Sequence, residues 1–352
     1  MPRVLVTGGC GYIGSHTLVE LIEDGIDAVS LDNNVRSDPS SMDGVRAITG
    51  HDVANWHADL RDEVATDATF AAIGGIDAVI HFAAFKSVGE SVREPLLYYD
   101  NNVRSLVNIL RSAERHGARH VVFSSSCSVY GNVDALPVTE ETALGQAESP
   151  YARTKQIGEK ILQDLAQVSP TNFVSLRYFN PVGAHDSALL GEVPVGGPEN
   201  LVPVITQTAI GKRDQLVVFG DDYDTRDGTC VRDYIHVSDV GRAHVDAVRY
   251  LLEGRNAHNW EVFNLGSGVG VTVLEAIAAF ERTTGVRLNY RVGPRRPGDV
   301  EAIYAENARA REVLGWRPAR DVNTMMATAW AWERKLAERH VDASAPRPQS
   351  QS

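Results

Sequence analysis

The fold is decided near the amino terminus by the stretch Val4-Leu5-Val6-Thr7-Gly8-Gly9-Cys10-Gly11-Tyr12-Ile13-Gly14. Its apolar start predicts a short buried strand, and the residues from Tyr12 to Asp24 predict a helix. Gly8, Gly11 and Gly14 are spaced three apart between these elements. A turn without Cβ atoms can approach a pyrophosphate closely, and the amides at a helix start attract its negative charge. The stretch therefore predicts a dinucleotide-binding unit.

A second expected strand, Ala28–Leu31, ends at Asp32. An acidic residue about 20 positions beyond the glycines belongs to the dinucleotide pattern. Its carboxylate can hold a ribose 2′-hydroxyl and repels a 2′-phosphate, which favours NAD over NADP. Taken alone, the glycines also fit a tight strand–helix turn without a ligand.

Further along the chain, expected strands alternate with expected helices. The strands are Ala78–Ile80, Val121–Phe123 and Phe173–Leu176, and the helices are Pro95–His116 and Tyr151–Gln167. A polar loop is expected over Asn33–Gly50. Such alternation predicts the α/β class, with a Rossmann-type doubly wound parallel sheet.

The pattern changes after Arg177. Residues 180–199 are rich in glycine, proline and polar side chains, and shorter elements follow at Leu201–Ile210, Leu216–Phe219 and Val273–Thr283. We therefore expect an NAD-binding domain over residues 1–179 and a smaller mixed α/β substrate domain over residues 180–340. The Ser/Pro/Gln-rich residues 341–352 predict a disordered tail.

Composition excludes several classes of protein. The 352 residues are 43% hydrophobic and 23% charged, as in a soluble globular protein. No apolar run reaches the roughly 18 residues of a membrane span. The net charge of −12 argues against a nucleic-acid partner. Cys10, Cys127 and Cys230 are widely spaced, which predicts neither a metal site nor a disulfide and fits a cytosolic location.

Tyr151 and Lys155 lie four residues apart, on one face of the expected helix, and an upstream strand ends in Ser124-Ser125-Ser126. A tyrosine with its usual pKa of about 10 needs a shift of about 3 units, or about 4 kcal/mol, to act as a base near neutral pH. An ammonium at about 4 Å offers a comparable energy at an effective dielectric of about 20, although burial opposes it.

Each of these features has an ordinary interpretation, as an exposed amphipathic pair and a polar strand end. Together with the glycine loop, they predict a catalytic site. Tyr151 is the expected acid–base, and Lys155 is expected to lower its pKa and to bond the nicotinamide ribose. Ser126 is expected to hydrogen-bond the reacting hydroxyl.

Longer stretches extend the pattern: Thr7–His16, Val88–Ser91, Tyr98–Asn102, Arg177–His185 and Val231–Val237. With these, the chain resembles the UDP-glucose 4-epimerase family of the extended short-chain dehydrogenase/reductase superfamily over about residues 3–335. The resemblance implies a homodimer that holds NAD permanently and interconverts UDP-glucose and UDP-galactose in galactose metabolism. It also implies that Tyr151, assisted by Ser126, deprotonates the sugar 4-hydroxyl while C4 loses a hydride, which returns to the opposite face of a 4-keto sugar.

The resemblance also implies two sets of contacts. Those expected at the cofactor are Gly8, Gly11, Tyr12, Ile13, Gly14, Asp32, Asn33, Asp59, Leu60, Phe82, Ala83, Lys86, Asn101, Ser124, Tyr151, Lys155 and Tyr178. Those expected at the substrate are Lys86, Ser126, Tyr151, Phe179, Asn180, Asn200, Leu201, Val217, Phe219, Arg232, Tyr234, Arg296, Asp299 and Ile303.

Several members of these sets also have plain structural interpretations. Lys86 and Arg296 could be solvated surface charges, Asn200 a helix N-cap, and Val217 and Phe219 core residues of a strand.

The sequence departs from the family at two places. Cys127-Ser128 stands where many relatives have Ala-Thr. Ile303 occupies the position where a large aromatic residue limits the pocket to unsubstituted hexoses and a small one admits N-acetylhexosamines, so UDP-N-acetylglucosamine and UDP-pentose epimerases stay open.

Two rival functions also stay open. A nucleotide-sugar dehydratase or decarboxylase begins with the same oxidation, but a dehydratase commonly has an Asp-Glu pair beside the catalytic hydroxyl, where this chain has Ser125 and Cys127 around Ser126. A non-catalytic NAD-sensing module needs no Tyr/Lys pair.

Overall fold

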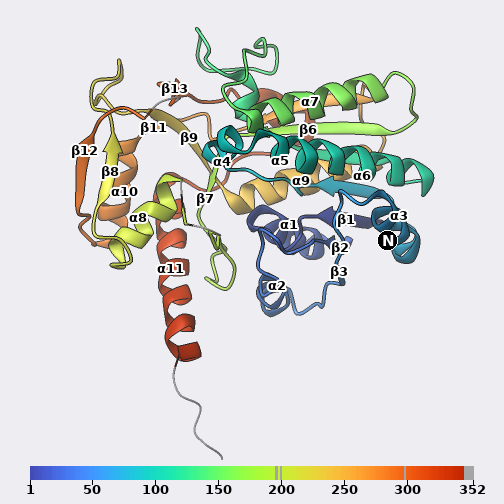
Figure 1. The fold of residues 1–352 in the computed structure, drawn as a ribbon, viewed down its shortest axis with the longest axis horizontal. Coiled ribbons are helices and arrows are strands. Elements are labelled where there is room, and N and C mark those ends of the chain that lie inside the picture. The colour runs from blue at the N-terminus through green and yellow to red at the C-terminus, as the bar shows by residue number, and fades with distance from the viewer. Residues whose placement is uncertain (195–196, 199, 297–298, 345–352) are drawn as a thin grey trace, which may run out of the picture.

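The computed structural model describes residues 1–194, 197–198, 200–296 and 299–344, with side chains described as far as residue 338 (Figure 1). Its larger sheet has seven parallel strands in the order β10-β6-β5-β4-β1-β2-β3. The strands are β1 (Arg3–Thr7), β2 (Asp27–Leu31), β3 (Asn55–Trp56), β4 (Ala78–His81), β5 (His120–Ser126), β6 (Asn172–Tyr178) and β10 (Trp260–Leu265). The strand order reverses between β1 and β4, which places a ligand crevice beyond their carboxyl ends. The predicted Rossmann-type sheet is confirmed.

Helices cover both faces of this sheet (Figure 1). One layer consists of α1 (Tyr12–Glu23), α2 (Ser41–Thr49) and α9 (Val237–Leu252), and the other of α3 (Glu63–Ile73), α6 (Arg104–Arg115) and α7 (Pro150–Leu165). Val4 and Val6 of β1 pack into the first apolar core, while Leu5 packs into the second. Because alternate residues of a strand point to opposite faces, a strand buried on both sides needs a continuous apolar run.

A smaller part of the molecule lies beside this sheet (Figure 1). Its four-stranded sheet contains β7 (Asn180–Val182), β9 (Val231–His236), β11 (Gly270–Thr272) and β13 (Ala302–Ile303), and a parallel pair joins β8 (Leu216–Phe219) to β12 (Tyr290–Gly293). Helices α8 (Leu201–Ala209), α10 (Val273–Thr284) and α11 (Val322–Ser344) pack around a core of their own.

Two local predictions need correction. The expected loop 33–50 contains α2, because Met42, Val45 and Ile48 form an apolar face that packs on the first core. The expected helix 95–116 is divided into α5 (Pro95–Tyr98), a π-helical turn (Tyr99–Val103) and α6. The remaining short elements are α4 (Val88–Arg93) and the turns Cys127–Tyr130 and Ala310–Leu314.

The expected division at residue 179 does not hold for residues 237–265. Helix α9 packs against α1, and β10 pairs with β6 through a register that sets Trp260 beside Phe173. This segment therefore completes the first sheet although it follows the start of the second part.

At the carboxyl end, α11 continues to Ser344, into the expected tail, and residues 345–352 lie outside the described part of the chain. None of the helices in the described ranges is long and apolar enough to cross a bilayer.

Candidate active site

The glycine loop is packed too closely for side chains. Gly8 has a φ of 72°, and a Cβ on it would lie 2.9 Å from the backbone nitrogen of Ala83. A Cβ on Gly14 would lie 2.2 Å from the carbonyl oxygen of Gly8. Helix α1 begins at Tyr12, so the amides of its first turn lie beside the loop. This cradle fits the pyrophosphate of a dinucleotide.

Asp32 is fixed beside the loop at the end of β2. Its buried carboxylate accepts hydrogen bonds from the backbone N–H groups of Cys10 (3.1 Å) and Asn34 (2.8 Å) and from the Ser37 hydroxyl (2.8 Å). Asp32 lines the same cavity as the glycine loop, and its ribose contact stays a prediction. The Ser37 bond was not predicted, because nothing in a Ser/Asp-rich stretch distinguishes that hydroxyl from its neighbours.

The expected adenine contacts, Asp59 and Leu60, follow β3. Asp59 pairs with Arg61 at 2.6 Å, and these hydrogen bonds lower the Asp59 pKa. The Leu60 carbonyl accepts a hydrogen bond of 2.8 Å from the Asn108 side chain.

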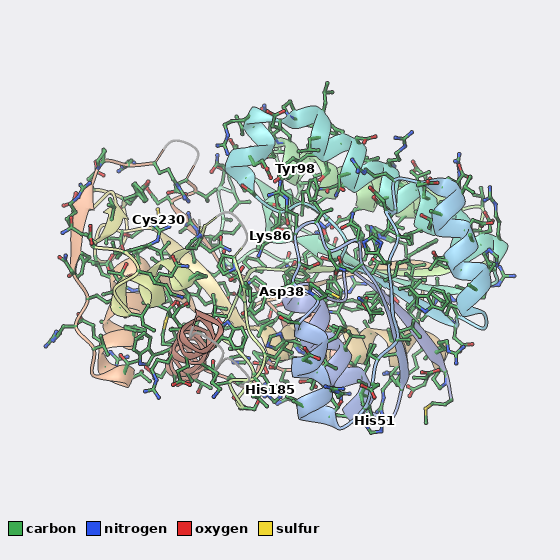
Figure 2. The ribbon with its side chains drawn as sticks, turned by 60° about the horizontal axis from the view of Figure 1, so that its bottom comes forward. Asp38, His51, Lys86, Tyr98, His185 and Cys230 are labelled. Carbon is green, nitrogen blue, oxygen red and sulfur yellow. The ribbon has the colours of Figure 1, made fainter. Side chains whose placement is uncertain are left out.

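Lys86 lies where the two parts of the molecule meet (Figure 2). Its ammonium donates to the Glu192 carboxylate at 2.7 Å and lies 5.9 Å from the centre of the Tyr12 ring. Lys86 thus lines the cavity and forms an ion pair, while its side chain is 62% exposed to solvent. Glu192 was not predicted, because it lies 106 residues from Lys86 and no spacing rule connects the two.

Helix α7 presents the Tyr/Lys pair to the end of β5. Ser149 caps the helix by accepting from the Ala152 N–H at 3.1 Å, and Pro150 occupies the first turn, an arrangement that fixes where the helix starts. Lys155 donates to the Ser124 carbonyl at 2.6 Å, and its nitrogen lies 5.9 Å from the centre of the Tyr151 ring.

The pKa values of this pair are governed by burial. Burial raises the Tyr151 pKa to about 12, and a hydrogen bond with Ser126 opposes the rise. Burial lowers the Lys155 pKa to about 7, and the Glu159 charge opposes the fall. Burial therefore dominates the Tyr151 pKa among the protein's own groups, and its lowering by Lys155 stays a prediction. The Lys155 ammonium donates its hydrogen bond to the Ser124 carbonyl.

The remaining expected cofactor contacts line the same region. The hydroxyl groups of Tyr178 and Ser124 are hydrogen-bonded to each other. Phe82 packs on His244 with ring centres 4.4 Å apart, and the Asn101 amide donates to Asn102 at 3.0 Å. Ser124, Tyr178 and Asn101 are buried, so their hydrogen bonds are shielded from solvent.

At the expected sugar end, Phe179 is buried and the Asn180 amide donates to the Asp233 carbonyl at 3.0 Å. Asn200 occupies the N-cap position of α8, yet its side chain makes no capping hydrogen bond. Ile303 of β13 is aligned with Arg232 of β9 and packs with Phe179.

A charged cluster lies at the expected substrate end of the cavity. Arg296 donates to Asp299 at 2.6 Å, and Arg232 lies 3.6 Å from the same carboxylate. The Arg296 guanidinium lies 5.7 Å from the centre of the Phe219 ring. Leu216 and Val218 are the core residues of β8, whereas Val217 and Phe219 face the opposite side. The core interpretation of Val217 and Phe219 is thus wrong.

All the predicted site residues line one cavity of about 1420 Å³. It exceeds the roughly 300–1,000 Å³ of an ordinary ligand pocket and so has room for more than one ligand. Arg36, Ser149 and Glu192 also line it and were not predicted from the sequence. Of these, only Ser149 could have been predicted, because Ser followed by Pro is typical of the start of a helix.

The large sheet is parallel, a glycine loop follows its first strand, and a Tyr-x-x-x-Lys helix faces a serine at the end of a strand. These three features define the short-chain dehydrogenase/reductase class. The family model for GDP-mannose 4,6 dehydratase matches residues 5–329. The UDP-glucose 4-epimerase of Bacillus subtilis strain 168 is 47% identical over 94% of this chain and 96% of its own length. That of Yersinia pestis is 46% identical over 96% and 99%.

Solved structures of UDP-glucose 4-epimerases have the same fold as this chain. The UDP-glucose-4-epimerase of Stenotrophomonas maltophila, with bound NAD and formylated UDP-arabinopyranose, superposes with a TM-score of 0.93 at 46% identity, covering 96% of this chain and 100% of the other. The Bifidobacterium longum enzyme, in complex with NAD+ and UDP, gives 0.90 at 45% identity over 95% and 98%. This chain belongs to the UDP-glucose 4-epimerase family.

Proposed function

We propose that the protein is an NAD-dependent UDP-glucose 4-epimerase, an isomerase that interconverts UDP-galactose and UDP-glucose. The observation that carries the proposal is the placement of Ser126, Tyr151 and Lys155 in one cavity with the glycine cradle and the Arg232–Arg296–Asp299 cluster. Relatives of nearly the same length carry this name, and the solved relatives hold NAD together with UDP or a UDP-sugar.

In this function the chain moves one proton and holds two ligands. The Tyr151 oxygen takes the proton of the sugar 4-hydroxyl, which Ser126 orients by a hydrogen bond, and later returns it. Lys155 stabilises the phenolate while it exists. Bound NAD supplies the redox chemistry, because it accepts the C4 hydride and returns it to the opposite face of the 4-keto sugar.

The other end of the cavity provides an anchor about which the 4-keto sugar turns. Guanidinium groups such as those of Arg232 and Arg296 bind phosphate oxygens through paired hydrogen bonds. Phe219 offers a ring face for the uracil. The glycine cradle, Asp32 and Lys86 are assigned to the cofactor, Lys86 at its pyrophosphate.

The direct test is to incubate the purified protein with UDP-galactose and no added NAD. We expect UDP-glucose to form, because permanently held cofactor is regenerated in every turnover. A reaction that consumes added NAD, or no conversion by protein that carries NAD, would contradict the proposal.

Ile303 predicts a preference for unsubstituted hexoses. Its side chain is larger than the residues that admit N-acetyl groups, so we expect kcat/KM for UDP-N-acetylglucosamine to be at least about tenfold below that for UDP-glucose, the lower range for pocket discrimination. Ile303→Ala should bring the kcat/KM values for the two substrates closer together. Equal values for both substrates in the unaltered protein would refute this assignment.

The rival functions are less well supported. The residues beside Ser126 are Ser125 and Cys127, whereas a dehydratase needs an acid–base pair there. A sensing module would not need Lys155 buried against Tyr151.

We also propose a cytosolic homodimer formed through two helices per subunit of the first domain. The exposed apolar side chains Val92 of α4 and Leu96 of α5 support such an interface, and sedimentation equilibrium tests it. The free thiols of Cys10, Cys127 and Cys230 support a reducing compartment.

A further inference from the structure

A buried ion pair lies directly behind the Ser/Tyr/Lys site. The Arg177 guanidinium of β6 donates to both carboxylate oxygens of Glu159 in α7, at 2.9 and 2.6 Å. The exposed fractions of the two side chains are 4% and 3%. The same carboxylate accepts a hydrogen bond from the Ser125 hydroxyl of β5.

The pair belongs to a polar row that crosses three strands. Ser125 of β5 and Asn264 of β10 are the cross-strand partners of Arg177. Arg177 also donates to the Tyr130 oxygen at 2.9 Å, and the Tyr130 hydroxyl donates to Asn264 at 2.6 Å. The row thus ties the end of β5 to β6, β10 and α7.

Stability alone does not account for this arrangement. Desolvating two charges costs about as much as their attraction returns, and apolar side chains of similar volume often stabilise a core as well or better. The position of the pair is more informative. Ser125 lies between Ser124, which receives the Lys155 hydrogen bond, and Ser126. Glu159 follows Lys155 by one helical turn.

Titratable side chains from three elements surround the Lys155–Tyr151 pair. Glu159 shares their helix, His81 faces Lys155 from β4, and Tyr178 faces Tyr151 from β6. Burial, with a smaller contribution from Lys155, lowers the His81 pKa to about 3, so this imidazole is neutral at neutral pH. Burial raises the pKa of the Tyr178 phenol. Glu159 supplies the negative charge that opposes the loss of the Lys155 proton.

We propose that Glu159 and Arg177 are positioning residues of the epimerisation: their ion pair fixes the strand end Ser124–Ser126 against α7, and the Glu159 carboxylate keeps Lys155 an ammonium ion. This inference rests on the proposed function. It assigns the two residues no contact with substrate or cofactor.

The test is Glu159→Gln, which keeps the shape and an acceptor oxygen but removes the charge. Side chains one helical turn apart are about 6 Å from each other, and a unit charge at about that distance shifts a pKa by about 2 units at an effective dielectric of about 20. We therefore expect the alkaline limb of the kcat–pH profile to move to lower pH by about one unit or more. The Lys155 pKa, measured by NMR on protein with labelled lysine, should fall by a similar amount. The chain has only five lysines, and a Lys155→Arg spectrum assigns the signal.

A matched control is Glu261→Gln in β10 of the same sheet. Glu261 is also buried, and it accepts from Tyr250 at 2.6 Å and from Arg309 at 3.4 Å. We expect this variant to lose stability without moving either the alkaline limb or the Lys155 signal. If Glu159→Gln behaved in the same way, the charge role would be overturned.

Arg177→Lys separates position from charge, and it carries the test if Glu159→Gln does not fold. It retains Glu159 but loses the two-bond fork, so kcat should fall about tenfold or more while the alkaline limb stays in place. Unchanged kcat would overturn the positioning role. If the unaltered protein lacked epimerase activity, the proposed function would fail, whereas the Lys155 titration would still decide whether Glu159 controls its charge.

Discussion

Tyr151→Phe is expected to lower the kcat of UDP-galactose epimerisation by at least about 100-fold, the lower range for removing a positioned general acid–base. The phenol is the group in the cavity that lies both beside Ser126 and over the Lys155 ammonium. Phenylalanine keeps the ring and its packing but removes the oxygen that carries the proton. Steady-state kinetics with UDP-galactose measures the loss.

Two controls make this result specific. The variant should still copurify with NAD, because the glycine cradle and Asp32 lie on other elements. Tyr250→Phe removes a buried hydroxyl that donates to Glu261, away from the cavity, and should retain normal turnover. If Tyr151→Phe epimerised the sugar as fast as the unaltered protein, the acid–base assignment would be wrong.

The parts of the fold that could be predicted are those in which neighbouring residues determine the structure. Val4–Val6, the glycine triplet and the helix from Tyr12 form one βα unit, and each of its signals is local. The prediction of a loop over 33–50 failed because three apolar residues of α2 matter only when a core lies opposite them. The division at residue 179 failed for β10, since the pairing of Trp260 with Phe173 joins distant parts of the chain.

The same distinction holds within the site. Tyr151 and Lys155 could be found because helical spacing places them on one face. Their pKa values could not, because burial is the largest cause of the shift at both residues and is known only from the folded structure. The partners Glu192 of Lys86 and Arg177 of Glu159 come from other elements, so no spacing rule connects them.

Gly14→Ala is the second substitution expected to have a large effect. In an ordinary helix this change stabilises by about 0.5–1 kcal/mol. Here the new methyl group would lie 2.2 Å from the Gly8 carbonyl oxygen and 2.9 Å from the Gly9 Cα, both backbone atoms that cannot rotate away. Forcing the loop and α1 apart costs about 1–3 kcal/mol and deforms the cradle. We therefore expect a lower melting temperature and protein that no longer copurifies with NAD.

Gly241→Ala provides the matched control, because Gly241 also lies within a helix, α9, that packs on α1. Its new methyl group would first meet the Glu20 Cγ at 3.3 Å, the stem of a flexible side chain. NAD released on denaturation and calorimetric melting should therefore distinguish the two variants. Full retention of NAD by Gly14→Ala, with an unchanged melting temperature, would mean that the contact between the loop and α1 is not what shapes the cofactor site.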